Sequence, residues 1–262
     1  MMVTEFLFRN GANIASLEQH IEDSYFFMRI EWELKDSSLR DEKSFKDAFE
    51  VIREKLKMNI RVDFCKRKKR VGLFCSKELH CLIDILARLE IGELDIEIPY
   101  VISNFSDCES VVENFKIPFF YISTKNGGYE QKQMQILHDH PTDVIVLARY
   151  MKILSEKFIT EVAQPIINVH HSFLPSFVGA KPYDEAYERG VKLIGATSHY
   201  VIPELDQGPI IEQTVKRIDH SSDSSGLKLV GRESEKEVLA FAIKKHIENK
   251  LIVYKNRVIV FQ

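Results

Sequence analysis

The spacing of apolar residues divides the chain into two parts with different patterns. In the first part, residues 12–21 and 25–34 are rich in β-branched and aromatic side chains, which favour strands. Apolar residues recur every three or four positions over residues 44–58, which predicts an amphipathic helix. A helix over residues 5–10 and a short strand over residues 60–64 complete the order helix, strand, strand, helix, strand. This order predicts a small α+β unit of the split βαβ type that lacks its first strand.

From residue 71 onward, predicted strands and helices alternate. Short apolar runs, typical of strands buried on both faces, predict strands at residues 71–75, 96–103, 118–123, 144–148 and from 166 onward. Helical spacing predicts helices at residues 78–91, 106–115, 129–139, 155–162 and 183–189. Two long strands at 193–202 and 210–218, a helix capped by Ser234 and a hairpin at 251–261 follow. The alternation predicts an α/β, Rossmann-like domain with a mostly parallel sheet covered on both faces.

A basic run over residues 65–70 separates the two patterns. We interpret it as a solvated linker, so that residues 1–70 form one domain and residues 71–262 the other. The alternative is a nucleic-acid patch. The chain as a whole carries 36 basic and 39 acidic side chains and a net charge of -3, which does not favour nucleic acid as a partner.

Composition indicates an ordinary globular protein of the cytoplasm. Apolar residues make up 45% and charged residues 29% of the chain. The four cysteines form no Cys-x-x-Cys pair, so a reducing compartment is expected. We expect no leader peptide and no membrane span, because no stretch approaches the roughly 18 consecutive apolar residues that a span requires.

Polar side chains with chemical potential follow the strand that begins at residue 166. Because side chains alternate along a strand, Asn168 and His170 are expected on one side and His171 on the other. About thirty residues later, a second polar cluster includes Asp206, which adds a carboxylate. An amide, an imidazole and a carboxylate suit carbonyl chemistry, in which donors stabilise a developing oxyanion and a proton is moved.

Two other chemistries remain as alternatives. Ser172 is close in sequence, but it lacks the glycine-flanked turn that exposes a nucleophilic serine. A metal could be held by a set of four polar residues, although no recognised zinc spacing occurs. The four are His170, His171, His199 and Asp206. We therefore expect no metal and no covalent nucleophile.

Several motifs, in the same order and spacing, resemble the deformylases of the folate-dependent formyltransferase family. The motifs are residues 76–82, 146–155, 168–183, 195–200 and 204–213. The resemblance covers nearly all of residues 71–262 and implies the formyltransferase fold. Residues 1–70 resemble the ferredoxin-like ACT domain that precedes it, except that the family's first strand is missing, which puts amino-acid regulation in question.

The resemblance implies both a site and a reaction. Asn168, His170 and Asp206 take the places of the catalytic asparagine, histidine and aspartate. A folate pocket would be lined by Met151, Lys152, Leu154, Ile202, Pro203, Glu204 and Leu205. The implied reaction is hydrolysis of 10-formyltetrahydrofolate to formate and tetrahydrofolate, which would supply formate for purine biosynthesis and balance one-carbon pools. No cofactor beyond the folate is implied, and the expected partners are the folate, an amino-acid regulator and further copies of the chain.

The loop after the first strand of the second domain favours water as the acceptor. Relatives that transfer the formyl group to a phosphorylated ribonucleotide carry a glycine-rich loop there, whose backbone amides cradle phosphate. Here the loop contains no glycine, and Glu78 would repel a phosphate. The alternatives are a formyltransferase that uses an amine acceptor and a folate- or amino-acid-binding protein without turnover.

Overall fold

A computed structural model describes residues 2–33, 41–65, 67–175, 182–218 and 223–262. The chain divides into two compact units, one up to Arg67 and one over Lys68–Val260. Residues 176–181 belong to the motif at residues 168–183 and lie outside the described residues, as do residues 221–222.

The first unit is a two-stranded hairpin packed on two helices. Its elements are α1 (Met2–Arg9), β1 (Asn13–Glu22), β2 (Tyr25–Glu33) and α2 (Glu42–Leu56). β1 and β2 are antiparallel. Aromatic residues form the core: the Phe45 ring stacks on the rings of Trp32 and Phe49, with centroids 5.3 and 5.4 Å apart. The helix–strand–strand–helix order therefore agrees with the sequence pattern.

The strand predicted at residues 60–64 is wrong, because this segment forms no strand. Ile60, Val62 and Phe64 nevertheless pack against the cluster that contains Phe45 and Phe49. Alternating apolar residues therefore report that one side of the segment is buried. They do not report whether its backbone finds a strand edge with which to pair.

The second unit is built on one large mixed sheet. Its strands are β3 (Lys69–Cys75), β4 (Ile96–Glu97), β5 (Val101–Ser103), β6 (Phe119–Tyr121), β7 (Val144–Ala148), β8 (Ile166–His170), β9 (Leu193–Tyr200) and β10 (Ile210–Arg217). They run in the order β10-β9-β8-β7-β3-β5-β6, with β4 also paired to β3. All pairs among the strands β3 to β8 are parallel. β9 pairs antiparallel with β8, and β10 pairs antiparallel with β9. The predicted mostly parallel α/β sheet is confirmed.

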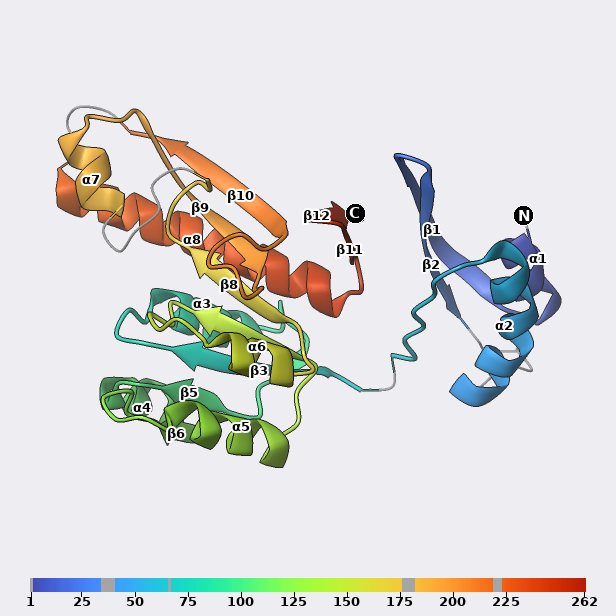
Figure 1. The fold of residues 1–262 in the computed structure, drawn as a ribbon, viewed down its shortest axis with the longest axis horizontal. Coiled ribbons are helices and arrows are strands. Elements are labelled where there is room, and N and C mark those ends of the chain that lie inside the picture. The colour runs from blue at the N-terminus through green and yellow to red at the C-terminus, as the bar shows by residue number, and fades with distance from the viewer. Residues whose placement is uncertain (1, 34–40, 66, 176–181, 219–222) are drawn as a thin grey trace. The chain divides into compact units, whose positions relative to one another are not determined.

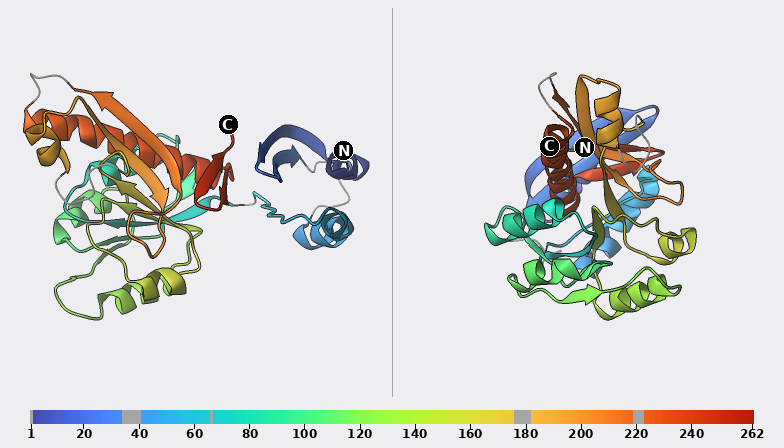
Figure 2. Two further views of the ribbon diagram at one scale, coloured as in Figure 1. Left: turned by 45° about the horizontal axis from the view of Figure 1, so that its top comes forward. Right: turned by 90° about the vertical axis from the view of Figure 1, so that its left-hand side faces the viewer.

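Helices cover both faces of this sheet (Figures 1 and 2). They are η1 (Ser106–Cys108), α3 (His80–Glu90), α4 (Glu109–Glu113), α5 (Tyr129–Asp139), α6 (Glu156–Glu161), α7 (Pro182–Glu188) and α8 (Ser224–Ile247). One apolar cluster joins residues of α3 and α8 to alternate strand positions, such as Val146 and Val169. A second joins residues of α5 and α6 to the opposite positions, such as Leu147. A hairpin of β11 (Leu251–Tyr254) and β12 (Arg257–Val260) follows α8, as predicted.

Two predicted boundaries in this unit are wrong. The strand expected at residues 96–103 is interrupted between β4 and β5, where Pro99 supplies no backbone N–H for a ladder. The last helix begins about ten residues before Ser234, because the Asp223 carboxylate accepts the backbone N–H of Gly226 at 2.7 Å. Ser234 lies inside α8 and donates to the carbonyl of Val230. None of the described helices combines the length and the apolar character needed to cross a membrane.

The packing of α3 gives a direct test of this core. Leu86 is 0% exposed, whereas Ile83 on the same helix is 45% exposed. Leu86→Ala is expected to destabilise the protein by about 2–5 kcal/mol, because it leaves a cavity against the sheet. Ile83→Ala is expected to change stability by no more than about 0.5 kcal/mol. Thermal unfolding of the two variants makes the comparison, and equal shifts would contradict the assigned face of α3.

Candidate active site

The strand β8 places Asn168 and His170 at the carboxyl edge of the parallel sheet. Its apolar residues anchor it, since Ile167 and Val169 are buried in the cluster under α3 and α8. β8 pairs with β7 on one side and with β9 on the other. Asn168 therefore lies between two well-packed neighbours, at the edge where open α/β sheets bind their ligands.

The loop between β9 and β10 brings Asp206 to His170. Asp206 has φ +55°, a left-handed conformation that is uncommon for a residue other than glycine. Gly208 lies so close to the end of β9 that a Cβ there would be 1.7 Å from the carbonyl oxygen of Tyr200. The loop thus folds tightly back, and an Asp206 carboxylate oxygen (Oδ2) lies 3.2 Å from His170 Nδ1.

His199 is a member of this cluster that sequence reasoning considered only as a metal ligand. The antiparallel register pairs it directly with Asn168. Its Nδ1 faces the carbonyl of Tyr200 at 2.9 Å and therefore carries a proton. Its Nε2 lies 3.2 Å from Asn168 Nδ2 and 3.6 Å from Asp206 Oδ1. A neutral ring accepts from the Asn168 amide, and a protonated ring faces the Asp206 carboxylate. The signal that could have identified it is the pairing of two polar strand ends.

The carboxyl group of Asp206 is ionised in this setting. Its side chain is 14% exposed. Burial by itself would raise its pKa, but hydrogen bonds from His170 and His199, together with their charges, hold the pKa well below its usual range. With Nδ1 turned to this carboxylate, the other ring nitrogen of His170, Nε2, is buried and has no hydrogen-bond partner among the described residues.

A small cleft opens beside these polar groups. Its walls are mainly apolar and come from the end of β7, the segment after it, and the loop after β9. The lining residues are Leu147, Tyr150, Ile153, Leu154, Ile159, Asn168, His199, Val201, Ile202, Pro203, Leu205 and Asp206. An apolar cleft with a few convergent polar groups is the usual form of a small-molecule site.

The predicted pocket residues do not all lie on this cleft. Leu154, Ile202, Pro203 and Leu205 line it. Met151, Lys152 and Glu204 are described but are not among the lining residues. Met151 is anchored by its backbone, whose N–H donates to Ser76 Oγ at 3.0 Å.

His171 belongs to the other side of β8, as the alternation predicts. Its buried ring packs against Tyr183, with centroids 6.2 Å apart. Among the described residues, the four side chains weighed as metal ligands do not form a group compact enough to hold one ion. That alternative grouping is therefore not supported by the geometry.

Comparison with known proteins agrees with the fold and the motifs. The family model described as formyl transferase matches residues 69–243. Formyltetrahydrofolate deformylase of Bacillus subtilis is 46% identical over 266 residues, covering 99% of this chain and 88% of the relative. The Synechocystis enzyme of the same name is 40% identical, covering 99% and 92%.

Solved structures show the same relationship. A formyltetrahydrofolate deformylase from Pseudomonas syringae superposes with a TM-score of 0.95 at 42% identity, covering 100% of this chain and 89% of that one. A phosphoribosylglycinamide formyltransferase from Anaplasma phagocytophilum gives a TM-score of 0.68 at 30% identity, covering 75% and 96%. The chain therefore belongs to the formyl transferase family, and within that family it groups with the formyltetrahydrofolate deformylases.

Proposed function

We propose that this protein hydrolyses 10-formyltetrahydrofolate to formate and tetrahydrofolate, with Asn168, His170 and Asp206 as its catalytic residues. The observation that carries the proposal is the cluster of the buried His170 with the part-buried Asn168 and Asp206, the latter two of which line an apolar cleft. In it, His170 Nε2 is a buried ring nitrogen without a partner among the described residues. We infer that this nitrogen finds its hydrogen-bond partner in the formyl oxygen of the bound substrate.

The cleft suits the flat ring system of a folate. Leu154, Ile202, Pro203 and Leu205 supply an apolar wall on which the rings lie. Met151, Lys152 and Glu204 lie outside the lining, and Met151 is 46% exposed. We assign these three residues to the outer, solvated part of the substrate. No further cofactor enters the proposal.

The chemical step requires few groups. A water oxygen forms a bond to the formyl carbon, and the Asn168 amide and His170 Nε2–H stabilise the resulting oxyanion. One proton of the attacking water passes, through solvent, to the folate nitrogen as the bond between that nitrogen and the formyl carbon breaks. The other is released to solvent when the formic acid ionises, so the products are tetrahydrofolate, formate and a proton. Holding the water and the formyl group in register is chiefly a problem of positioning.

Asp206 acts mainly as an orienting group in this proposal. Because its pKa is held low by its histidine neighbours, its carboxylate is a weak base at neutral pH. The same negative charge fixes His170 Nδ1–H and offsets the positive charge of the ring when Nε2 also carries a proton. We therefore assign the carboxylate to orientation and electrostatic stabilisation, and not to removal of the water's proton.

The loop after β3 supports water as the acceptor over an amine. Ser76 is buried and donates to Asn104 at 2.6 Å, and Glu78 is paired with Arg232 at 2.7 Å. The Ser76 hydroxyl and the Arg232 guanidinium, which could otherwise bind an acceptor's phosphate, are thus already paired within the chain. Transfer to an amine remains the second candidate, since the fold is shared with phosphoribosylglycinamide formyltransferases.

We further propose that the first unit is an ACT-like regulatory domain and that the protein assembles as a homo-oligomer. The exposed apolar residues Ile21 and Phe26 of its hairpin support a surface for association. The four cysteines, none of them in a Cys-x-x-Cys pair, support a reducing cytoplasm. Release of formate is consistent with a role in one-carbon and purine metabolism.

A formate assay without any amine acceptor tests the reaction. The wild-type protein is expected to release formate from 10-formyltetrahydrofolate, and Asp206→Asn is expected to lower kcat about 100-fold or more, because the orienting charge is lost. Asp139→Asn, which neutralises a half-exposed carboxylate on α5, serves as the control and is expected to retain full activity. Turnover that requires an added amine would favour transfer, and substrate binding without turnover would favour a binding protein.

Asn168→Ala tests the oxyanion donor. Loss of one donor is expected to lower kcat about 100-fold to 1000-fold and to leave KM within a few-fold, because the donor acts mainly in the transition state. Asn114→Ala removes an exposed amide at the C-cap of α4 and is expected to have no effect on either constant. A rise in KM with unchanged kcat would assign Asn168 to substrate binding instead.

The low pKa of Asp206 predicts how stability depends on pH. The carboxyl group in the unfolded chain has its ordinary pKa of about 3.9, so its folded-state advantage is complete above that value. The advantage is lost as the pH falls toward the lower folded-state pKa. The stability difference between wild type and Asp206→Asn is therefore expected to be constant from about pH 5 to about pH 7. It is expected to shift against wild type below about pH 4, near the pKa of the unfolded chain. Denaturant unfolding at each pH measures it, and a difference that does not change with pH would contradict the assignment.

A further inference from the structure

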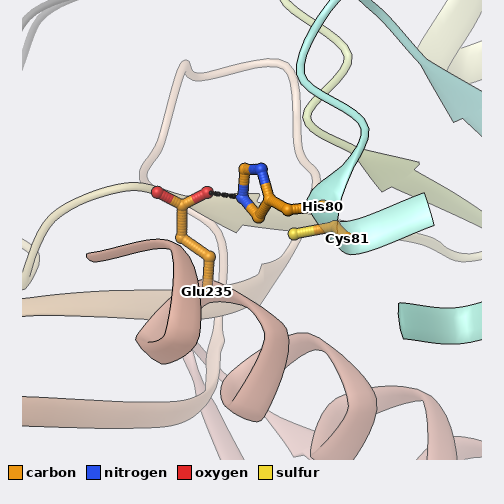
Figure 3. Close-up of side chains that lie close together, drawn as sticks. All are labelled: His80, Cys81 and Glu235. Atoms are coloured by element: carbon orange, nitrogen blue, oxygen red, sulfur yellow. Dashed lines mark hydrogen bonds and ion pairs between the residues drawn. The ribbon is translucent and has the colours of Figure 1, made fainter. Parts of the chain in front are cut away.

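A second polar cluster lies on the α3 and α8 side of the sheet. We call its four residues Arg149, His80, Glu235 and Tyr183 the Arg149 cluster. The Glu235 carboxylate, 0% exposed, is its centre. One oxygen (Oε2) lies 2.7 Å from His80 Nε2 and 3.3 Å from Arg149 Nε, and the other accepts the Tyr183 hydroxyl at 2.6 Å. Figure 3 shows His80 and Glu235 facing each other from α3 and α8.

The cluster contains more donors than it uses. Arg149 Nε and Nη1 are buried and make no hydrogen bond to the described residues, although Nε is ion-paired with the Glu235 carboxylate at 3.3 Å. His80 Nδ1 is also buried without a hydrogen bond, but it is the acceptor nitrogen of a neutral ring whose Nε2 faces Glu235, and Glu78 Oε2 lies 4.0 Å from it. Glu235 cannot serve them all, because its two oxygens already face three groups. Buried donors are nearly always satisfied by protein, water or a ligand, so a second acceptor is expected at this place.

The backbone of Arg149 is held in an unusual conformation. Its φ is +62°, and its N–H bonds the carbonyl of Leu147 at 3.1 Å in a tight turn directly after β7. Such a conformation is unfavourable for residues other than glycine. Here the turn accompanies a guanidinium group that reaches Glu235 on α8.

The amino end of α3 adds positive potential to the same place. His80 is the first residue of this 11-residue helix, and Leu79 before it provides no side-chain cap. The first turn of α3 contains no acidic residue. The free backbone N–H groups of a helix start favour an anion nearby, in agreement with the unused Nη1 of Arg149. Glu78, two residues before the helix, opposes an anion here, but its carboxylate is paired with Arg232 at 2.7 Å.

Cys81 lies beside His80 and Glu235, and together the three offer atoms within 4.8 Å of one another (Figure 3). A cation is nevertheless disfavoured at this point. Arg149 places a positive charge 3.3 Å from the carboxylate. Burial, and then the charge of Glu235, raise the pKa of the Cys81 thiol, so it is not the thiolate that a metal requires. The surplus of donors favours an anion.

The Arg149 cluster adjoins the catalytic residues from the side opposite the cleft. In the register of β7 and β8, Leu147 pairs with Asn168, so Arg149 and His170 each lie two residues beyond that pair. The His170 and His171 rings are 5.0 Å apart, and His171 packs on Tyr183, which donates to Glu235. A ring atom of Tyr183 would be 2.2 Å from a Cβ at position 231, so Gly231 allows this close approach.

We propose that the Arg149 cluster is a subsite for a small carboxylate, and that the product formate binds there as it leaves the hydrolytic site. The proposal rests on the hydrolysis proposed above. Formate matches the chemistry because it is a planar carboxylate that accepts two parallel N–H groups from a guanidinium. It is also small, which suits a cluster whose side chains are only 11% (Arg149), 13% (His80) and 0% (Glu235) exposed. The subsite takes the anion away from the folate, so that release does not wait for the folate to leave.

The expected affinity is weak. The ceiling on binding per atom, applied to the three non-hydrogen atoms of formate, corresponds to a Kd of about 0.5 mM or weaker. We therefore propose titration of the folate-free protein with ¹³C-formate, followed by NMR line broadening at constant ionic strength with chloride as the balancing anion. Turnover and product inhibition by formate are measured on the same preparations.

Variants at two positions of the cluster are expected to act in opposite directions. Arg149→Met is expected to weaken formate binding at least about tenfold, and Arg149→Lys to weaken it less, because the charge remains but the paired donors do not. Glu235→Gln is expected to strengthen binding about threefold or more, because no internal carboxylate then competes for the guanidinium. Arg88→Met is the control: Arg88 lies on α3, as His80 does, but it is paired with Asp84 at 2.7 Å and is expected to leave binding unchanged.

The results that would overturn the subsite are specific. Equal formate binding by wild type and Arg149→Met would do so, as would a wild-type titration that formate and chloride affect alike. Weakened binding in both Arg149→Met and Glu235→Gln, with matching losses in thermal stability, would show a purely structural network. Formate binding without turnover would refute the hydrolysis and leave the subsite standing, whereas turnover without formate binding would do the reverse.

Discussion

The contact between His170 and Asp206 is the interaction on which the candidate active site depends. It joins the end of a buried central strand to a loop more than thirty residues later, at a distance of 3.2 Å. Neither partner could hold this geometry alone. β8 is fixed by ladders on both sides, and the loop is fixed by its close approach to the end of β9 at Gly208. The packing of the sheet and of this loop thereby fixes the orientation of the His170 ring.

The two faces of the sheet contribute different chemistry to the same strand end. On the α5 and α6 face, an apolar cluster ends in the cleft, where Leu147 and Leu154 face the space that we assign to a folate. On the α3 and α8 face, the apolar cluster ends in the polar Arg149 cluster. Residues at the end of β8 contact both sides, since Asn168 lines the cleft and His171 packs toward Tyr183. A reaction that splits a folate substrate into a folate product and a small anion suits this arrangement.

The same comparison bears on the choice between water and an amine. A fold shared with phosphoribosylglycinamide formyltransferases does not itself specify the acceptor. The difference lies in what occupies the space next to the catalytic groups. Here the first turn of α3 and the loop before it interact with Glu235, Arg232 and Asn104 of the chain itself. Such internal pairing leaves the site suited to small species on that side.

Much of this architecture was predictable from residue pattern alone, because burial on one or both faces of an element leaves a period in the sequence. β7 and α5 have the predicted bounds, and most other elements differ by a few residues. The failures share a cause. Residues 60–64 alternate but have no strand edge to pair with, and the start of α8 is set by Asp223, which a later capping motif concealed. Pairing and capping depend on neighbours that periodicity does not report.

For the candidate site, the sequence by itself determined that Asn168 and His170 share one side of a strand and that His171 faces the other, because side chains alternate. It also marked Asp206 as a carboxylate near another strand end. Only the tertiary structure decided that His199 stands opposite Asn168, since register is a property of two strands together. The Arg149 cluster likewise draws its members from α3, α7, α8 and the end of β7. Residues so distant along the chain meet only when the sheet and its helices have packed, and no local pattern records that meeting.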